Sequence, residues 1–329
     1  MVDNPVDVQQ PAGAWDEYWR LTREAASHKG GGPQDEVLAR FWVSFFKDAL
    51  SRASGRRLLD LACGNGAVTR FALDAVGISD RQMPSVISVD HSLAALKELA
   101  KRFPQVFAVA ADANRTPFAD GLFDVVVSQF GLEYAGIEAV EEAARLVARG
   151  GMLAAVLHLK GGAIYRECAT NLEAIEGVRA CEILPAVKNA FRAGVAASHD
   201  RASKSDFRQA HTRLAAAVKE LEGILHIHGE GVAGGAVHRL YTDVSHMYSR
   251  LNAYDATEVA NWANGMAREI VAYASRMSSM LAAAIDDQGI DEIAKRITSR
   301  GLSVRIREKL HMGVSRKEPA AWVFVSDRG

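Results

Sequence analysis

The segment Leu58–Thr69 contains the residue types and spacing that point most directly to chemistry. An apolar run typical of a buried strand has Asp60 near its end, and a loop of small residues and a predicted helix follow. Gly64 and Gly66 have no Cβ, so a ligand can lie against the backbone there. A dinucleotide loop would have a third glycine where Thr69 stands, and the charge of Asp60 would repel a phosphate. The loop therefore favours a ligand with a cationic amino group.

Four later segments have the composition of strands and follow in the order expected of alternating strands and helices. The first of them ends at Asp90, roughly 20 residues beyond Gly66, where a carboxylate can bind ribose hydroxyls in a strand–helix–strand unit. Ser92 is expected to cap the helix that follows. We predict the four strands at 86–90, 106–113, 123–130 and 149–157.

These ordered motifs resemble those of the class I S-adenosylmethionine-dependent methyltransferases, and Asp60–Gly66 is similar to the first motif of that family. Ala62 stands where the family usually has its first glycine. The resemblance implies an α/β fold with a seven-stranded, mostly parallel, doubly wound sheet, and S-adenosylmethionine as the cofactor. It places His91 beside the adenine, Asp112 on the adenine amino group and the Ala113 N–H on a ring nitrogen. The implied cofactor-binding residues are Asp60, Ala62, Cys63, Gly64, Gly66, Asp90, His91, Asp112, Ala113, Ser128 and Gln129.

The segment Ser128–Tyr134 occupies the C-terminal end and exit of the strand predicted at 123–130, where the transferable methyl group should point. Gln129 is expected to contact the methionine part of the cofactor, and Glu133 and Tyr134 to face the acceptor. Alternatively, Glu133 merely begins a helix, where a carboxylate interacts favourably with the helix dipole. The segment lacks an Asn-Pro-Pro-Tyr type of motif, which argues against DNA bases and protein glutamine as acceptors.

His158 follows the strand predicted at 149–157, at the same edge of the sheet. Methyl transfer from a sulfonium depends mainly on positioning and on exclusion of water, and a base is needed only when the acceptor is protonated near neutral pH. A histidine suits that role because histidine changes charge near neutral pH. The alternative is a structural histidine bonded to loop carbonyls. The catalytic candidates are therefore His158, Glu133 and Tyr134.

The composition is that of an ordinary folded protein: 329 residues, 49% hydrophobic, 24% charged, with a net charge of −1. This balance provides no electrostatic reason to bind nucleic acid or an anionic membrane. No segment approaches the roughly 20 apolar residues that cross a bilayer, and the N-terminus has no secretory signal pattern. Cys63, Cys168 and Cys181 form neither a disulfide framework nor a metal-site spacing, so we expect a cytoplasmic protein.

The spacing of apolar residues changes along the chain and divides it into parts. Apolar residues recur at helical spacing over 163–287 with no convincing strand, which predicts four or five helices. Near the N-terminus, Trp15, Tyr18 and Trp19 either form a lid over the cofactor or pack on the core. The predicted parts are N-terminal helices with a candidate lid (1–55), a cofactor-binding core (56–160), a helical insertion (161–288) and a last helix with an antiparallel strand pair (289–329).

The insertion contains several histidines, but we predict no metal site from them, because histidines and carboxylates are common on helix surfaces. His246 or Tyr241 is better suited to line an acceptor pocket. The residues considered for a metal were His226, His228, His238, Asp243 and His246.

We therefore expect methyl transfer to oxygen or nitrogen of a small molecule, since so long an insertion can enclose a pocket. Alternatively, the insertion forms a homodimer interface and leaves an open site for a protein or a carrier-bound substrate. A third reading is a domain that binds S-adenosylmethionine as a sensor or for another reaction, and a fourth is an interaction protein on a fold that has lost its ligand. The sequence does not identify the acceptor.

Overall fold

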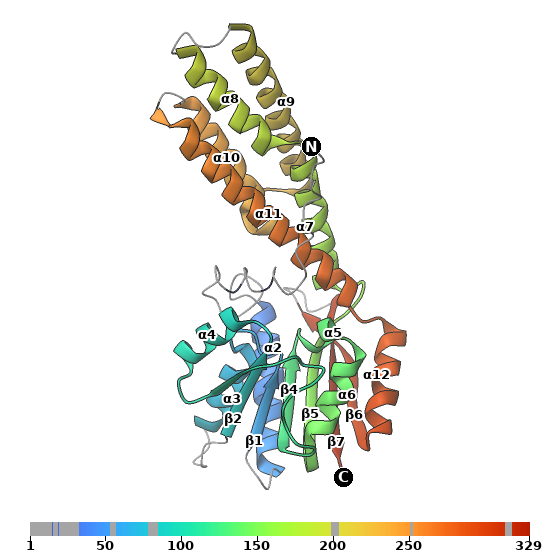
Figure 1. The fold of residues 1–329 in the computed structure, drawn as a ribbon. Helices are drawn as coiled ribbons and strands as arrows, with labels where there is room; N and C mark the ends of the chain where they lie inside the picture. The colour runs from blue at the N-terminus through green and yellow to red at the C-terminus, as the bar shows by residue number, and fades with distance from the viewer. Residues whose placement is uncertain are drawn as a thin grey trace, which may run out of the picture. The chain divides into compact units, whose positions relative to one another are not determined.

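A computed structural model describes residues 15, 19, 33–52, 57–77, 85–198, 204–250, 253–312 and 318–329. The chain forms two compact units, one made of residues up to Arg166 together with Ser279–Gly329, and the other of Glu167–Ser278 (Figure 1). The first unit contains the sheet and all the candidate cofactor and catalytic residues. The described part of the second unit is helical.

The first unit is built on a seven-stranded sheet in the order β3-β2-β1-β4-β5-β7-β6 (Figure 1). The strands are β1 (Arg57–Leu61), β2 (Ser85–Asp90), β3 (Phe107–Ala110), β4 (Phe123–Gln129), β5 (Val147–His158), β6 (Leu302–Met312) and β7 (Glu318–Arg328). Strands β1 to β5 pair in parallel, whereas β7 pairs antiparallel with both β5 and β6. The predicted seven-stranded, mostly parallel α/β sheet is confirmed.

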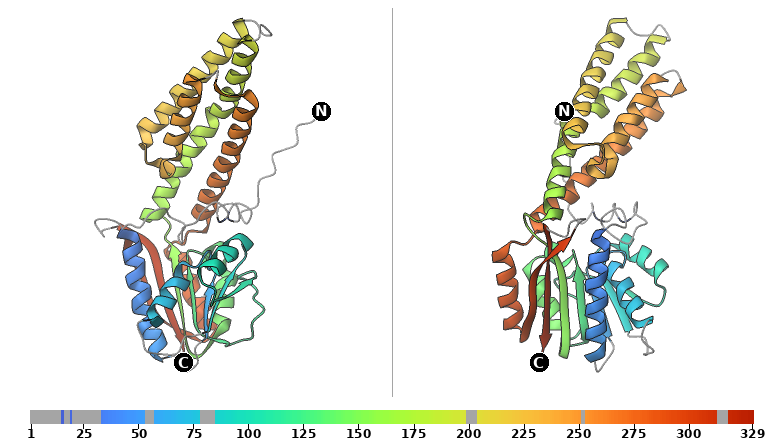
Figure 2. Two further views of the ribbon diagram at one scale, coloured as in Figure 1. Left: turned by 90° about the vertical axis from the view of Figure 1, so that its left-hand side faces the viewer. Right: turned by 180° about the vertical axis from the view of Figure 1, so that it is seen from behind.

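Helices cover both faces of the sheet (Figure 2). They are α2 (Pro33–Arg52), α3 (Ala67–Gly77), α4 (Leu93–Arg102), α5 (Leu132–Ala135), α6 (Ile137–Leu146) and α12 (Asp287–Ser299). Helix α2 packs on α3, β5 and β6, whereas α6 packs on α12, β4 and β5. Small residues such as Ala139 and Ala143 let α6 approach the sheet closely, and Ile290 and Ile293 of α12 complete that apolar core.

The strand order determines where a ligand can bind. β1 lies between β2 and β4, so the chain leaves β1 toward one side of the sheet and later returns on the other. The loops that follow β1 and β4 therefore leave the same edge of the sheet as neighbours. In open α/β sheets this reversal point is where ligands bind.

The insertion consists of α7 (Ala163–Ala180), α8 (Ile183–Ser198), α9 (Lys204–His228), a 3₁₀ turn (Val232–Gly235), α10 (Ala236–Ser249) and α11 (Ala256–Ala283). Its apolar positions form a core of their own, in which Phe191, Leu214, Leu221 and Leu240 are buried. The helices lie between β5 and α12, as predicted. None of the helices in the described part of the chain has the length and apolar character needed to cross a bilayer.

The third strand is shorter than predicted. β3 ends at Ala110, so the expectation of a strand over 106–113 is wrong at its C-terminal end. Asp112 lies in a turn, where its Oδ1 accepts a hydrogen bond from the backbone N–H of Asn114 at 2.9 Å. Such a local side-chain bond competes with the strand ladder and ends it.

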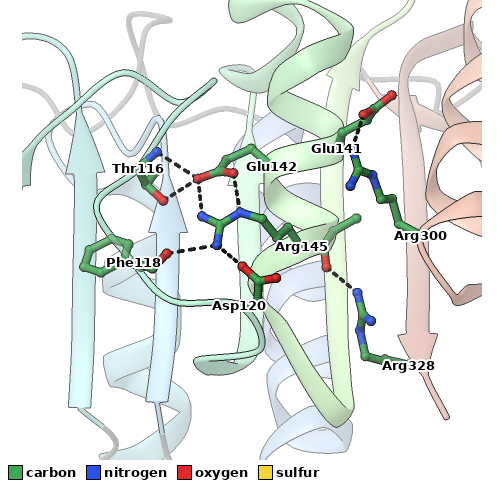
Figure 3. A network of polar contacts seen from close by, with 9 residues as sticks. Thr116, Phe118, Asp120, Glu141, Glu142, Arg145, Arg300 and Arg328 are labelled. Carbon is green, nitrogen blue, oxygen red and sulfur yellow. Dashed lines mark hydrogen bonds and ion pairs between the residues drawn. The ribbon is translucent and has the colours of Figure 1, made fainter.

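A charged network ties the segment after β3 to α6 (Figure 3). Oε1 of Glu142 accepts hydrogen bonds from the backbone N–H and the hydroxyl of Thr116 at 2.8 and 2.6 Å. Arg145 donates to both carboxylate oxygens of Glu142 at 2.7 Å, and also to the carbonyl of Phe118 at 2.9 Å and to Asp120. Burial alone would raise the pKa of Glu142, but the hydrogen bonds from Arg145 and Thr116 hold that pKa below its usual value.

Replacing Glu142→Gln should lower the free energy of unfolding at pH 7 by about 1–3 kcal/mol, because a buried network loses its charge. Since the pKa of Glu142 is lowered by folding, this stabilisation exists above the unfolded value of about 4.3 and disappears as the pH falls below it. Urea unfolding of both proteins between pH 3 and 7 measures the difference.

The matched control is Asp120→Asn, which removes a largely exposed partner of the same arginine. Its effect should stay within about 1 kcal/mol. Equal losses in the two variants at pH 7 would contradict the role assigned to Glu142.

Candidate functional site

Asp60 lies in β1 and is only 1% exposed. Its Oδ2 accepts hydrogen bonds from the backbone N–H and the hydroxyl of Thr69 at 2.9 and 2.6 Å, and that hydroxyl lies 2.9 Å from the hydroxyl of Ser88. Its Oδ1 has no hydrogen-bond partner among the described residues. Burial raises the pKa of Asp60 to about 7, while the hydrogen bonds from Thr69 act in the opposite direction. A cation beside Oδ1 would favour the ionised carboxylate.

The loop after β1 turns through left-handed backbone at Ala62, Gly64 and Gly66, where φ is 55, 54 and 93°. Aromatic side chains of the protein lie where a Cβ on these glycines would point. A Cβ on Gly64 would lie 2.8 Å from the indole of Trp19, and one on Gly66 would lie 3.0 Å from the ring of Phe103. The two glycines thus allow aromatic rings to pack on the loop, in addition to the ligand contact expected from the sequence.

Asp90, at the end of β2, binds the glycine loop directly. Its Oδ2 accepts a hydrogen bond from the Gly64 N–H at 2.7 Å, and its Oδ1 accepts one from the Ser92 N–H at 2.8 Å. Burial raises the pKa of Asp90, and the hydrogen bonds from Ser92 and Gly64 lower it. The hydroxyl of Ser92 caps α4 by accepting from the Ala95 N–H at 3.2 Å, which confirms the predicted cap.

The residues predicted around the adenine lie along the carboxyl ends of β2 and β3. The two strands are parallel, and Asp90 is paired with Ala110. The segments that follow them, with His91 after β2 and Asp112 after β3, therefore leave the same edge of the sheet from neighbouring strands. The side chains of Asp112 and His91 are exposed, and Ala113 is buried.

Cys63 occupies the glycine loop without the environment of a reactive thiol. The side chain is buried, and the backbone N–H donates to the carbonyl of Val89 at 2.9 Å. Burial, followed by the charges of Asp90 and Asp60, raises the pKa of Cys63 well above its usual value. The thiol is therefore neutral, and its small size explains its place in the loop.

Glu133 and His158 form a buried pair at the carboxyl ends of β4 and β5, with exposures of 7% and 2%. Oε1 of Glu133 accepts a hydrogen bond from the backbone N–H of His158 at 2.9 Å and lies 2.7 Å from Nδ1 of the same residue. The two side chains therefore share one hydrogen between Oε1 and Nδ1, which fixes the orientation of the imidazole ring. Neither Nε2 nor Oε2 of Glu133 has a partner among the described residues.

Aromatic rings flank this Glu133–His158 pair. The ring of Phe130 lies 4.3 Å from the imidazole centroid, and Tyr134 meets the imidazole edge-on at 5.8 Å. Trp15 packs edge-on against Tyr134 at 5.4 Å. Phe130 adopts left-handed backbone, with φ of 52°, and its N–H donates to the carbonyl of Val156 at 2.8 Å. Tyr18, the third N-terminal aromatic of the sequence prediction, lies outside the described residues.

Gly131 brings the loops after β1 and β4 into contact. A Cβ on Gly131 would lie 2.6 Å from the Cβ of Ala62 and 2.8 Å from its carbonyl oxygen. Ser128, at the end of β4, is fully buried, and its hydroxyl has no hydrogen-bond partner among the described residues. The candidate cofactor loop and the candidate acceptor side thus meet at van der Waals distance.

Gln129 shows what sequence reasoning missed. Its side-chain oxygen accepts a hydrogen bond from the indole N–H of Trp42, on α2, at 2.6 Å. In the sequence, the position of Trp42 on an apolar helix face accounts for this residue without a polar partner. Nothing in the sequence therefore pointed to its contact with Gln129. Only their position next to Gln129 in the chain pointed to Phe130 and Gly131.

The histidines of the insertion do not assemble a metal centre: the part of the chain that the structure describes has no group of three or more suitable ligands. Nδ1 of His246 lies 3.3 Å from the hydroxyl of Tyr254, and Tyr241 donates to Glu222 at 2.9 Å. These contacts lie within the second unit.

Residues 58–151 match a family model described as a methyltransferase domain. This is a class I methyltransferase domain. The match runs from β1 into β5 and includes the glycine loop, Asp90 and Asp112, and the strand order is the one that the resemblance implied. It confirms the predicted family and S-adenosylmethionine as the cofactor that such domains use.

The methyltransferase domain also has curated relatives. The chain is 37% identical over 118 residues to a demethylmenaquinone methyltransferase of Beutenbergia cavernae. The aligned residues make up 35% of this chain and 46% of that protein. A demethylmenaquinone methyltransferase of Renibacterium salmoninarum is 35% identical over 116 residues, with the same coverage. The chain thus spans about half the length of the curated relatives it matches. Among solved structures, an S-adenosylmethionine-dependent methyltransferase of Mesorhizobium loti is 20% identical with a TM-score of 0.30, covering 36% of this chain and 53% of that chain.

Replacing Ala62→Gly should raise the free energy of unfolding by up to about 1 kcal/mol. Left-handed backbone costs an alanine roughly 1–2 kcal/mol, and the greater freedom of glycine in the unfolded chain offsets part of the gain. Urea unfolding measures the change. Ala100→Gly, at an exposed position of α4, is the control and should destabilise by roughly 0.5–1 kcal/mol. If Ala62→Gly lowered the free energy of unfolding by a similar amount, the strain assigned to Ala62 would be contradicted.

Proposed function

We propose that the protein transfers the methyl group of S-adenosylmethionine to a small-molecule acceptor. The observation that carries this proposal is the contact of Gly131 with Ala62. It joins the glycine loop of the methyltransferase domain to the loop that leads to Glu133, whose partner is His158. A cofactor and a base would therefore meet at one edge of the sheet, at the reversal point of the strand order.

The chemistry of the loop fits this cofactor. When bound, S-adenosylmethionine supplies an electrophilic methyl group on a sulfonium. The unpartnered, buried Oδ1 of Asp60 suits its ammonium group, and we assign Asp90, at the end of β2, to the ribose hydroxyls. The residues proposed to hold the cofactor are Asp60, Ala62, Cys63, Gly64, Gly66, Asp90, His91, Asp112, Ala113, Ser128 and Gln129.

In this proposal His158 receives a proton from the acceptor at Nε2. Glu133 is a positioning residue, because its carboxylate holds the hydrogen on Nδ1 and orients the ring. Tyr134 and Trp15 cover the pair and exclude water, and Trp19 covers the glycine loop in the same way. In this proposal Trp15 and Trp19 act as the lid considered from the sequence.

Several observations support a small acceptor. The curated relatives are named for demethylmenaquinone, a small molecule. The net charge of −1 offers no attraction to nucleic acid or to an anionic membrane. We place the reaction in the cytoplasm and assign the insertion to acceptor selection. A dimer in solution, measured by light scattering at micromolar concentration, would instead favour the insertion as a homodimer interface with a protein or carrier-bound substrate.

Calorimetric titration with S-adenosylhomocysteine and with NADH tests the cofactor. We expect binding of the first and none of the second. Asp90→Asn should weaken S-adenosylhomocysteine binding by about 1–3 kcal/mol, because a charged acceptor of hydrogen bonds is lost. Asp74→Asn, at an exposed position of α3, should change nothing. Unchanged affinity in Asp90→Asn would remove Asp90 from the cofactor site, and binding of NADH would overturn the cofactor assignment.

Steady-state turnover tests the base, once methyl-labelled cofactor has identified an acceptor. His158→Gln should lower kcat by about 100-fold or more and leave S-adenosylhomocysteine affinity unchanged. His311→Gln, at an exposed position of β6, is the control. Equal activity of His158→Gln across pH 6–9 would make His158 a structural residue.

A further inference from the structure

We infer that Trp42, on α2, is a positioning residue of the cofactor site. Its indole fixes the side-chain amide of Gln129 so that the amide N–H groups bind the carboxylate of the cofactor's amino-acid part. This inference rests on the proposed function. The contact of Trp42 with Gln129, and the place of Gln129 beside Asp60 and the glycine loop, carry it.

The contact with Trp42 determines which way the amide of Gln129 is turned. The two ends of a glutamine amide have nearly the same shape, so shape alone does not orient the group. The indole N–H of Trp42 can only donate, and it lies 2.6 Å from Oε1 of Gln129. The oxygen therefore faces Trp42, and Nε2, with its two hydrogens, is turned away from the indole.

Trp42 is itself held firmly. It is fully buried, and its ring packs on Phe45 and Phe46 of the same helix, with centroid distances of 5.8 and 5.7 Å. A buried indole N–H requires an acceptor, and Gln129 provides it. Helix α2 ends at Arg52, before the residues 58–151 that match the methyltransferase domain. The orientation of Gln129 is therefore set by a helix outside that match.

Gln129 lies on the same face of the sheet as Asp60. In the parallel pairing of β1 and β4, Asp60 is opposite Val127, and side chains two residues apart on a strand point to the same face. Gln129 is therefore level with the start of the glycine loop. The contacts agree, because Asp60 binds Thr69 of α3 and Gln129 binds α2, which packs on α3.

An amino-acid group has an ammonium and a carboxylate close together. Oδ1 of Asp60 is proposed to bind the ammonium, so the carboxylate needs donors nearby. Neither the loop 62–66 nor the segment 129–134 contains a lysine or an arginine. The other amide of these segments, Asn65, is buried, whereas Gln129 is half-buried. Hydrogen bonds to a charged oxygen are stronger than those between neutral groups, so the two N–H groups of Gln129 suit the carboxylate.

Calorimetry with two ligands tests the inference. One is S-adenosylhomocysteine, and the other is its decarboxylated analogue, which keeps the ammonium and lacks the carboxylate. Gln129→Met should weaken S-adenosylhomocysteine binding by about tenfold or more, because the donors to the carboxylate are lost. Trp42→Phe should weaken it by about three- to tenfold, because the amide can then turn its oxygen toward the ligand. The affinity for the decarboxylated analogue should change by less than about twofold in both variants.

Gln129→Glu tests the amide without changing α2, which keeps the test decisive if Trp42→Phe does not fold. The new side chain still offers an oxygen to Trp42, but an oxygen replaces Nε2. We expect a weaker affinity for S-adenosylhomocysteine than in Gln129→Met, because two carboxylates repel each other. The affinity for the decarboxylated analogue should be kept or increased.

A double variant separates positioning from a general loss of packing. If Trp42 acts through Gln129, the combination of Trp42→Phe with Gln129→Met should bind S-adenosylhomocysteine no more weakly than Gln129→Met alone. Trp322→Phe is the control, because it removes a similar indole bond, to the carbonyl of Ile285 at 2.9 Å. It should leave both affinities unchanged, and circular dichroism confirms that each variant is folded.

The outcomes distinguish this inference from the proposed function. Equal weakening of both ligands by Trp42→Phe, additive losses in the double variant, or unchanged S-adenosylhomocysteine affinity in Gln129→Met would overturn the inference alone. A wild-type protein that binds neither ligand would overturn the proposed function, and this inference with it.

Discussion

The close approach of the loops after β1 and β4 constrains everything else at the candidate site. Gly131 lies so close to Ala62 that even a methyl group on Gly131 would overlap it. Ala62 and Phe130 both adopt left-handed backbone, which costs roughly 1–2 kcal/mol for each of them. The strained conformations persist because β1 and β4 are paired neighbours whose buried side chains anchor both loops.

Buried polar atoms differ in their hydrogen bonding between two regions of the first unit, the network around α6 and the carboxyl edge of the sheet. Around α6, both carboxylate oxygens of Glu142 are bonded, so this network stabilises the fold. At the carboxyl edge of the sheet, Asp60, Glu133 and His158 each bury an atom that has no partner among the described residues. Each such atom costs roughly 1–3 kcal/mol while its hydrogen bond is missing. In the proposed function a ligand supplies the missing bonds at the carboxyl edge of the sheet.

Local patterns in the sequence were sufficient for most of the fold. Apolar runs ending at small or acidic residues predicted the parallel strands, and helical spacing predicted the insertion, because strand and helix periodicity reflect short-range burial. The pattern failed where a local bond or a bulge intervened. Asp112 ends β3 early by binding the Asn114 N–H. The register of β6 with β7 shifts between Val304 and Ile306, which breaks the alternation that marks a strand.

The sequence by itself determined the family, the order of the elements and the position of the glycine loop proposed to bind the cofactor, since these depend on residues that are close together in the chain. Only the tertiary structure decided which side chains meet. Glu133 and His158 are 25 positions apart and Trp42 and Gln129 are 87 apart, and spacing along the chain does not indicate either pair. Their contacts arise from strand order, register and the path of α2 across the sheet. Those features depend on the packing of the whole domain, which no local pattern encodes.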